Sequence, residues 1–461
     1  MANRIVPLVV AAGLFMENMD ATVIATSLPA IAADLGEDPV ILKLAFTAYL
    51  LSLAVFIPVS GWAADRFGAR LVFRLAIVGF VMGSIGCALA ENLEGLIAAR
   101  VVQGLGGAMM VPVGRLVVLR LVPKSEIVSA MALVTMPALI GPVIGPPLGG
   151  FITTYFHWRW IFWINIPVGL VGFIMASIWI PDVREPSPAR LDAVGFLLSG
   201  LGLSALIFGL TVIGRDLLSA SAVGLLIAGG ALLMALYVMH ARRAPVPVLD
   251  LRLLAVETFR SAIIGGFLFR LGVGSLPFLL PLLLQLQFGL TPFESGLLTF
   301  VSAAAAIAMK VTAPPILRRY GFREVLVWNA LMSAVVIAAT ALFTRTTPHA
   351  AIFLVLLIGG FFRSLQFTSL NALAFADIDN VHMSRATSFS GVVQQLAIST
   401  GVAVAALVLE TARGWRGESV LTQADFAFAF VAVAAIVALS AVVHRGLPSG
   451  AGAELVGRSG N

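Results

Sequence analysis

Two acidic residues stand three positions apart in an otherwise apolar stretch near the start of the chain. Glu17 and Asp20 fall within segment 5–31, which is long enough to cross a lipid bilayer. Residues three apart share one face of a helix, so both carboxylates face the same surroundings. Mutual repulsion and burial both disfavour their charged forms. A carboxyl group under these constraints is suited to bind and release a proton, and we expect Asp20 and Glu17 to couple protons to another process.

Basic side chains occupy the same kind of surroundings. Arg100, Arg115, Arg270, Lys310 and Arg363 all fall inside apolar segments. Charges within a membrane are costly, and they mark a substrate or proton pathway unless they form a structural ion pair or extend to the interface. Arg100 and Arg115 lie in the same half of the chain as the two acids, so we predict that one of them pairs with Asp20 or Glu17 and that both take part in proton coupling. Extension to the interface is the alternative for Arg100, which lies toward the outer end of its segment.

A second set of residues is expected to bind a substrate. The later segments carry further cations and several amides, and the predicted set is Arg115, Arg270, Lys310, Arg363, Gln366, Asn371 and Gln394. The amides either line a cavity or only join helices. An excess of cations over acids favours a substrate with a carboxylate or phosphate group. An exporter of organic anions, for example citrate or another metal-chelating acid, therefore competes with a multidrug exporter.

The composition indicates that lipid surrounds most of the chain. Of the 461 residues, 60% are hydrophobic and 11% are charged, whereas a soluble domain carries about 25% charged residues. So few charges cannot cover a water-exposed surface. The net charge of +6 would suggest a nucleic-acid partner in a soluble protein, but here the arginines sit in short loops between apolar runs, so none is expected. The single cysteine, Cys87, excludes an intramolecular disulfide.

About fourteen segments are apolar and long enough to span a bilayer, which predicts an all-α polytopic membrane protein. They cover residues 5–31, 41–62, 71–90, 95–119, 126–153, 159–180, 193–213, 219–240, 256–285, 293–314, 325–344, 350–375, 387–411 and 424–443. Basic residues concentrate in alternate loops, on the side of the N-terminus. By the positive-inside rule, both termini are expected in the cytoplasm.

A weak internal repeat predicts how these segments are grouped. Residues 66–70 follow the second segment and residues 319–323 follow the tenth, and both read Arg-aromatic-Gly-x-Arg. Two halves of six helices with two helices between them explain this spacing. We expect a six-helix bundle over 1–185, two inserted helices over 186–250, a second six-helix bundle over 251–446 and a flexible cytoplasmic tail over 447–461.

Three longer motifs combine glycine, proline and charge. The first follows the second segment and contains Gly61, Asp65, Arg66, Gly68 and Arg70. The second, in the fourth segment, is Arg100-x-x-Gln103-Gly104-x-Gly106-Gly107. The third, in the fifth segment, contains Gly141, Gly145, Pro146, Gly149 and Gly150. Small residues four apart permit close helix contact, and proline bends a helix.

These motifs, in this order and over nearly the whole chain, resemble those of the major facilitator superfamily. Together with Asp20–Pro29, Trp158–Gly169 and the two extra helices, they are similar to its 14-helix drug:proton antiporter branch, the EmrB/QacA type. The resemblance implies that the first motif latches the outward-facing state, that Arg100 serves proton coupling, and that the third motif is the one found in exporters. Ala69 departs from the family's usual basic residue, and Arg318 stands where an aspartate is usual in the second copy.

The resemblance and the membrane charges together predict a proton-coupled exporter of small molecules, of multidrug or organic-anion type, that works by alternating access in the inner (plasma) membrane. A facilitative uniporter and a non-transporting membrane sensor are the alternatives. No catalytic triad, Walker loop or metal-ligand cluster is present in the sequence. We therefore expect no enzymatic activity, cofactor or metal. The expected partners are a small-molecule substrate, protons and the lipid bilayer, with the protein acting as a monomer.

Overall fold

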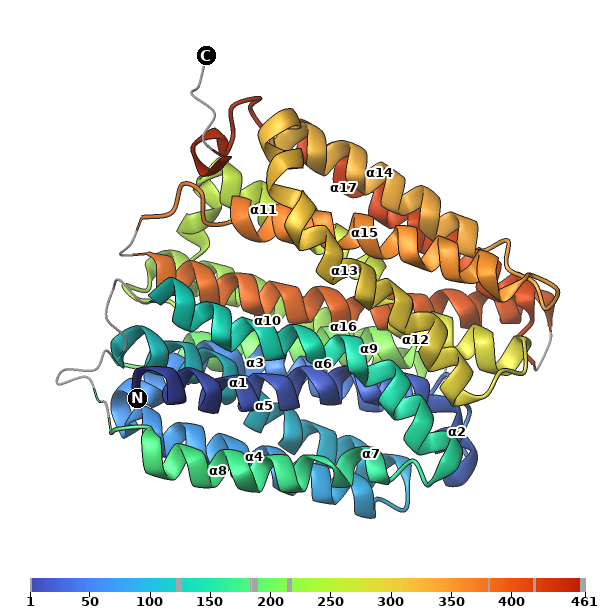
Figure 1. Cartoon of the computed structure of the whole chain (residues 1–461), viewed down its shortest axis with the longest axis horizontal. Helices are drawn as coiled ribbons and strands as arrows, with labels where there is room; N and C mark the ends of the chain where they lie inside the picture. The colour runs from blue at the N-terminus through green and yellow to red at the C-terminus, as the bar shows by residue number, and fades with distance from the viewer. Residues whose placement is uncertain are drawn as a thin grey trace. The chain divides into compact units, whose positions relative to one another are not determined.

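A computed structural model describes residues 2–121, 127–182, 184, 190–213, 218–379, 382–417 and 420–456. Helices make up nearly all of this part of the chain, and it contains no strand (Figure 1). The prediction of an all-α polytopic protein is confirmed. The helices divide into two compact units, the first over Met1–Ser204 and Thr291–Gly296, the second over Ala205–Leu290 and Leu297–Asn461. The three-part grouping expected from the repeat stays a prediction.

Unit 1 holds the helices that carry Glu17, Asp20 and Arg100. In chain order these elements are α1 (Ala2–Val23), the 3-10 turn η1 (Ile24–Thr26), α2 (Leu28–Leu35), α3 (Lys43–Phe67), α4 (Ala69–Leu89), α5 (Leu93–Leu121), α6 (Ile127–Tyr155), α7 (Trp160–Trp163), α8 (Asn165–Trp179) and the first part of α9 (Ala193–Val212). The first residues of α13 also belong to it.

Unit 2 holds the helices that carry Arg270 and Arg363. Its elements are the second part of α9, α10 (Ala220–Arg243), η3 (Leu251–Ala255), α11 (Glu257–Gly274), α12 (Leu276–Leu282), the π-helical turn η4 (Leu283–Gln287), α13 (Pro292–Tyr320) from Leu297 onward, α14 (Phe322–Thr340), α15 (His349–Leu373), α16 (Met383–Arg416), α17 (Gln423–Arg445) and η5 (Ala453–Val456). The last of these turns falls in the predicted tail.

Twelve helices in the described part of the chain are long and apolar enough to cross a membrane. The two remaining predicted segments, 126–153 and 293–314, coincide with α6 and α13, each of 29 residues. Large apolar side chains face outward from these helices, for example Leu225 on α10, which is 74% exposed. Such a surface is stable only when lipid covers it.

Three predicted single helices are interrupted in the structure. Segment 5–31 bends through η1, and α2 restarts with Pro29 in its first turn. Segment 159–180 is divided at Ile164 into α7 and α8, and segment 256–285 becomes α11, α12 and η4. Proline lacks the N–H that a helix interior needs, so it favours the first turn of a new helix. The interruption after Val23 places the end of α1 just beyond Asp20.

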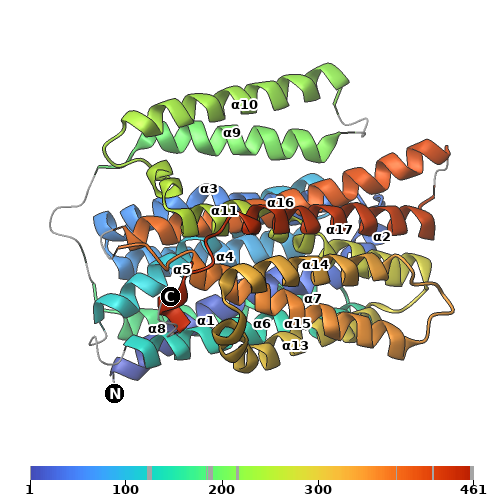
Figure 2. The same ribbon diagram turned by 90° about the horizontal axis from the view of Figure 1, so that it is seen from above.

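Helix α9 contacts different partners along its length. In unit 1 the ring of Phe196 lies 5.9 Å from that of Phe56 on α3. In unit 2 a Cβ atom added to Gly209 would lie 2.8 Å from Ile227 of α10, and the two helices run side by side (Figures 1 and 2). These contacts are apolar, as expected for helices surrounded by lipid.

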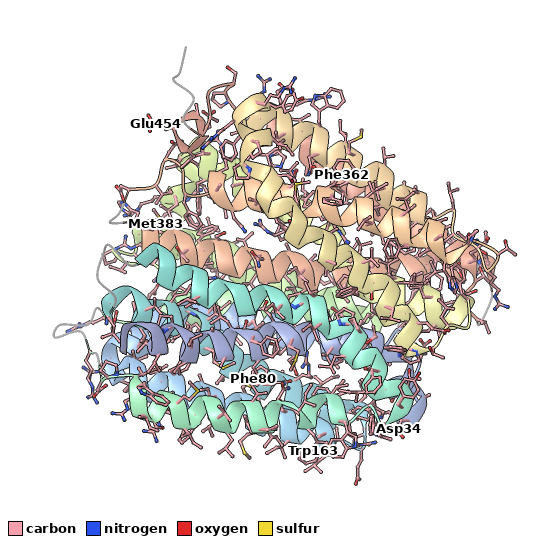
Figure 3. The ribbon with its side chains drawn as sticks, in the orientation of Figure 1. Asp34, Phe80, Trp163, Phe362, Met383 and Glu454 are labelled. Carbon is pink, nitrogen blue, oxygen red and sulfur yellow. The ribbon has the colours of Figure 1, made fainter. Side chains whose placement is uncertain are left out.

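Close contact between α4 and α5 depends on glycine. A Cβ atom at Gly106 would overlap the backbone nitrogen of Phe80 and lie 2.7 Å from the carbonyl oxygen of Ala76. Phe80 itself is fully buried inside unit 1 (Figure 3). Small residues at such contacts let two membrane helices approach closely enough for their backbones to touch. This contact sets the distance between α5, which carries Arg100, and α4.

We expect Gly106→Ala to lower the stability of the folded protein by about 1–3 kcal/mol, because the new methyl group forces α4 and α5 apart. Thermal unfolding of the purified protein in detergent, followed by tryptophan fluorescence, measures the loss. Gly229→Ala on α10 is the matched control, since no atom lies within 4 Å of a Cβ placed there. Equal melting temperatures for the two variants would contradict the prediction.

Candidate functional site

Asp20 and Arg100 form a buried ion pair in unit 1. Nη1 of Arg100, from α5, lies 2.5 Å from Oδ2 of Asp20, from α1. Asp20 is 3% exposed and Arg100 is fully buried. Arg100 was predicted either to pair with an acid or to extend to the interface, and the structure places it in the pair. Two opposite charges removed from water are strongly coupled, because little solvent screens them.

Amide and hydroxyl groups complete the coordination of the Asp20 carboxylate. Nε2 of Gln103 and Nδ2 of Asn165 each donate to Oδ1 of Asp20 at 2.8 Å. Both nitrogens also donate to Oγ of Ser84, at 2.7 Å and 3.1 Å. We call Asp20, Ser84, Arg100, Gln103 and Asn165 the Asp20 network. It joins α1, α4, α5 and α8, and every hydrogen bond to the carboxylate favours its charged form.

Aromatic rings cover the Arg100 guanidinium. Its carbon Cζ lies 4.2 Å from the ring centroid of Tyr49 and 5.9 Å from that of Phe162. Nη1 of Arg100 also donates to Oε1 of Gln103 at 2.6 Å. A cation over an aromatic face is stabilised by the ring quadrupole, most strongly where water is excluded. The arginine is therefore held in one position as well as neutralised.

Glu17 lies one turn from Asp20 and has no comparable partner. It is 8% exposed, and its Oε2 atom has no hydrogen-bond partner. The charges of Arg115 and Asp20 both act on it. Arg115 is exposed and makes no direct ion pair with Glu17 within the described residues. The structure thus brings Asp20 and Arg100 together. The charges of Glu17 and Arg115 act on each other, but the two side chains form no ion pair within the described residues.

The first motif lies where α3 ends and α4 begins. Gly68 has a φ angle of +94°, which a residue with a side chain rarely adopts. Oδ1 of Asp65 accepts a hydrogen bond from Nη2 of Arg120 at 2.8 Å, and Arg70 donates to the carbonyl oxygen of Ser177. Arg66 is exposed. The motif thus links the ends of α3, α4, α5 and α8.

The third motif lies along the contact between α6 and α1. A Cβ atom at Gly141 would lie 2.9 Å from the backbone nitrogen of Met19, and one at Gly145 would overlap Thr22. Similar overlap occurs at Gly149 with Val23. The carbonyl oxygen of Pro146 accepts a hydrogen bond from Thr26 at 3.4 Å, and Gly150 lies against the start of α13. The motif therefore packs against the helix that carries Asp20.

A cluster around Asp34 lies near one end of unit 1 (Figure 3). Oδ2 of Asp34 accepts hydrogen bonds from Nε1 of Trp158 at 3.0 Å and from Nη1 of Arg159 at 2.6 Å. Burial alone would raise the pKa of Asp34, but these hydrogen bonds and the charge of Arg159 outweigh it, so the pKa lies below its ordinary value. The cluster fixes the start of α7, which leads directly into Asn165.

Among the predicted substrate-binding arginines, Arg270 is the most deeply buried. It is 2% exposed, and its Nη2 donates to Oδ1 of Asn371 at 2.9 Å. Its guanidinium lies 5.7 Å from the ring centroid of Phe367. Asn371 is exposed. Burial removes the Arg270 guanidinium from water, and no acid forms an ion pair with it within the described residues.

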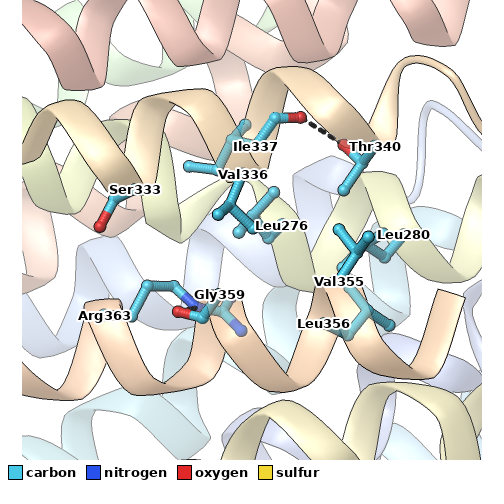
Figure 4. Close-up of a pocket in the computed structure, with 10 residues that line it drawn as sticks. All are labelled: Leu276, Leu280, Ser333, Val336, Ile337, Thr340, Val355, Leu356, Gly359 and Arg363. Atoms are coloured by element: carbon cyan, nitrogen blue, oxygen red, sulfur yellow. Dashed lines mark hydrogen bonds between the residues drawn. The ribbon is translucent and has the colours of Figure 1, made fainter. Parts of the chain in front are cut away.

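Arg363 lines a small pocket between α12, α14 and α15 of unit 2 (Figure 4). Its Nε donates to the carbonyl oxygen of Gly359, one turn back on the same helix, at 3.2 Å. Ser333 lies at the same end of the pocket and its buried hydroxyl has no partner, whereas Leu280 and Val355 lie at the other end. No acid acts on Arg363 within the part of the chain that is described.

The remaining predicted substrate residues differ in their surroundings. Gln366 is fully buried, accepts a hydrogen bond from Asn329 at 2.8 Å and donates to the carbonyl oxygen of Leu326, so it joins α15 to α14. Gln394 is half-buried on α16. The side chain of Lys310 lies outside the described residues. The structure does not bring this set together as one cluster, and its role in substrate binding stays a prediction.

Sequence reasoning did not single out Ser84, Tyr49 or His444. Tyr49 lies against Arg100, and Ser84 accepts hydrogen bonds from Gln103 and Asn165, which both bind Asp20. His444 is fully buried on α17, and its Nδ1 lies 3.1 Å from Oγ of Ser261. Ser84 and Cys87 stand three apart on α4, a spacing that places them on one helix face. Many pairs of residues in a helix have this spacing, so it is only a weak sign that Ser84 belongs to a functional site.

Known proteins share this sequence and this fold. The sequence profile of the Major Facilitator Superfamily matches residues 10–240 and 262–455. The chain is 38% identical to a protein named "Putative multidrug resistance protein MdtD" from Yersinia enterocolitica over 446 residues, which cover 96% of this chain and 95% of that protein. It is also 38% identical over 447 residues to a protein of the same name from Salmonella paratyphi B, covering 96% and 94% of the two chains.

Solved structures of transporters have the same fold at low sequence identity. The POT family transporter PepTSo has a TM-score of 0.71 at 14% identity, and the match covers 96% of this chain and 97% of that chain. A D-xylose–proton symporter has a TM-score of 0.70 at 14% identity, with 97% and 98% covered. The human organic anion transporter MFSD10 has a TM-score of 0.62 at 16% identity, with 96% and 99% covered. The matched profile and the two relatives cover nearly the whole length, and the chain belongs to the major facilitator superfamily of membrane transporters.

Proposed function

We propose that the protein is a proton-coupled exporter of small molecules in the inner membrane, with both termini in the cytoplasm. The observation that carries the proposal is the buried pair of Asp20 and Arg100, with the acid Glu17 one turn away. The names of the relatives support a drug-type substrate. The two six-helix bundles over 1–185 and 251–446 are proposed to rock around a central site.

Protonation of Asp20 would convert a neutral pair into an unpaired buried cation. Within the described residues Arg100 has no second acid at hydrogen-bond distance. Its other neighbours, Gln103 and the rings of Tyr49 and Phe162, carry no charge. Removing one partner of a buried pair costs about 3–5 kcal/mol. Rearrangement of α1 against α5 relieves this cost, and proton binding is thereby linked to a change of conformation.

Two other functions predict different behaviour in the same assay. A facilitative uniporter would move substrate down its own gradient and would not respond to an imposed pH gradient. A non-transporting sensor would show no flux in proteoliposomes. The buried ion pair favours the exporter over both, since a charge pair is costly to bury and is usually retained in a membrane for proton or ion movement.

We expect Asp20→Asn to abolish substrate accumulation driven by a pH gradient, while exchange of substrate for substrate continues. Asparagine keeps the size of the side chain but cannot release a proton at neutral pH. Flux of a panel of neutral and charged dyes into everted proteoliposomes, with and without an imposed gradient, measures both activities. Glu91→Gln is the matched control, because it removes an exposed carboxylate of unit 1 outside the Asp20 network. Full proton-driven flux in Asp20→Asn would refute the proposal.

A substrate that carries a carboxylate or phosphate group is favoured over a lipophilic cation. Arg270 and Arg363 both lie inside unit 2, and no acid acts on either of them within the described residues. A membrane arginine without an acid is stabilised when a bound anion supplies the missing charge. Lys310 is proposed to contribute a third positive charge.

We expect Lys310→Ala and Arg363→Gln each to lower transport of anionic dyes at least about tenfold, a loss of about 1.4 kcal/mol of binding. Transport of cationic and neutral dyes should persist, because these substrates do not need the positive charge. Arg319→Gln, near the end of α13, is the control for a general loss of positive charge. Equal loss for anionic and cationic dyes would indicate damage to the fold and contradict an anion site.

A further inference from the structure

Asn165 has one polar atom engaged and one without a partner, although it is fully buried. Its Nδ2 donates to Oδ1 of Asp20 at 2.8 Å and to Oγ of Ser84 at 3.1 Å. Its Oδ1 atom has no hydrogen-bond partner. A buried amide oxygen without a donor costs about 1–3 kcal/mol, and this oxygen is available to accept a hydrogen bond in another state of the network.

The charge state of Asp20 decides which amide atom fits beside it. The charged carboxylate only accepts hydrogen bonds, so it requires the Nδ2 atom of Asn165. The protonated carboxyl group carries an O–H, which requires an acceptor. With the amide in its present orientation, that O–H would point at another donor.

The proton is best placed on Oδ1 of Asp20, because the other oxygen faces Arg100. Oδ2 lies 2.5 Å from Nη1 of Arg100, and a guanidinium has no acceptor for an O–H. Oδ1 faces the two amides of Gln103 and Asn165. Protonation at Oδ1 therefore makes one of the two amides present an oxygen.

Gln103 is restrained at both ends of its amide, whereas Asn165 is not. Oε1 of Gln103 accepts from Nη1 of Arg100 at 2.6 Å, and its Nε2 donates to Ser84 as well as to Asp20. Turning Gln103 would break all of these contacts. Turning Asn165 breaks its hydrogen bond to Ser84 and replaces the bond that Nδ2 donates to Asp20 by one that Oδ1, which now lacks a partner, accepts from the carboxyl group.

We infer that Asn165 senses the protonation state of Asp20 by rotating its amide by half a turn, donating Nδ2 to the charged carboxylate and accepting from the protonated acid through Oδ1. This inference rests on the proposed proton binding by Asp20. In the step a hydronium ion gives up its proton: one O–H bond of hydronium breaks, leaving water, and one O–H bond forms at Oδ1 of Asp20. Asn165 thus offers the carboxyl group of Asp20 a suitable hydrogen-bond partner in both protonation states.

Other titratable groups face Asp20 from the helices packed around it. Glu17 lies on the same helix, Tyr49 on α3, Cys87 on α4 and Arg100 on α5, and their charges act on one another and on Asp20. Arg115 acts on Glu17. From α8 the neighbour of Asp20 is the uncharged amide of Asn165, so removing it changes hydrogen bonding without adding or removing a charge.

The test is an infrared titration of the purified full-length protein in lipid, with Asn165→Leu as the variant. The carbonyl stretch of a protonated carboxyl group is followed as the pH is lowered, and the band of Asp20 is identified by its loss in Asp20→Asn. We expect the titration midpoint to move to higher pH by about one unit in Asn165→Leu, because the hydrogen bond that the charged form loses is stronger than the one that the protonated form loses. The band should also shift to higher frequency, because the protonated form loses its acceptor.

Two variants guard against a purely structural effect. Asn165→Ser keeps a group that both donates and accepts, and it should restore the wild-type midpoint and frequency in part. Asn329→Leu removes a buried asparagine of unit 2 that also has an amide oxygen without a partner. Within the described residues Asn329 donates to the carbonyl oxygen of Phe362 and to Gln366, and to no member of the Asp20 network. The Asn329→Leu variant should leave the Asp20 band unchanged.

Each result decides the inference. A higher midpoint and frequency in Asn165→Leu, absent from Asn329→Leu, supports it. An Asp20 band that titrates in Asn165→Leu as in the wild type overturns the role of Asn165 and leaves the proposed function standing. If no band is lost in Asp20→Asn, or if that variant retains proton-driven flux, Asp20 is not the proton carrier, and the proposed function is overturned together with the inference.

Discussion

The attraction between Arg100 and Asp20 is the interaction on which the rest of unit 1 depends. Both side chains are removed from water, so each would be unstable without the other. The contact requires Asp20 on α1 and Arg100 on α5 to lie at the same level along the two helices. Gly106 lets α4 pack closely against α5, and Gly145 lets α6 pack closely against α1. The charged contact thus joins α1 to α5, and the neutral groups around it bring in α4 and α8.

A buried ion pair adds little stability, but it makes the structure sensitive to protonation. An apolar pair of similar volume would often be at least as stable, because burying two charges costs nearly as much as their attraction returns. What the charged pair adds is a dependence on protons. The surrounding amides of Gln103 and Asn165 and the rings of Tyr49 and Phe162 keep the pair dry in the described arrangement, which makes the loss of one charge a large perturbation.

The sequence predicts the fold class and the existence of a membrane ion pair, but not which arginine forms it. Length and hydropathy are enough for the spans, because nearly all of each helix must be apolar in lipid. Choosing Arg100 over Arg115 requires the rotation of α5 relative to α1, which depends on packing with α4 and α3. The contact between Asn165, just after the interruption at Ile164, and Asp20 joins residues 145 positions apart, so it equally depends on tertiary packing. Gln366 was expected near a substrate or between helices, and its partner Asn329 lies 37 positions away on α14, a contact that periodicity cannot predict.

Cys87, the one cysteine of the chain, can report on whether water reaches the region around Asp20 and Arg100. Sγ of Cys87 lies 3.8 Å from Oε1 of Gln103, and Cys87 is fully buried. Maleimides and similar reagents attack the thiolate, so a dry thiol is inert until water penetrates. Because the 461 residues include one cysteine, the unaltered protein already carries a site-specific chemical reporter. The rate of its alkylation follows how often the interior beside the charged pair becomes wet, with no need to engineer a cysteine-free background.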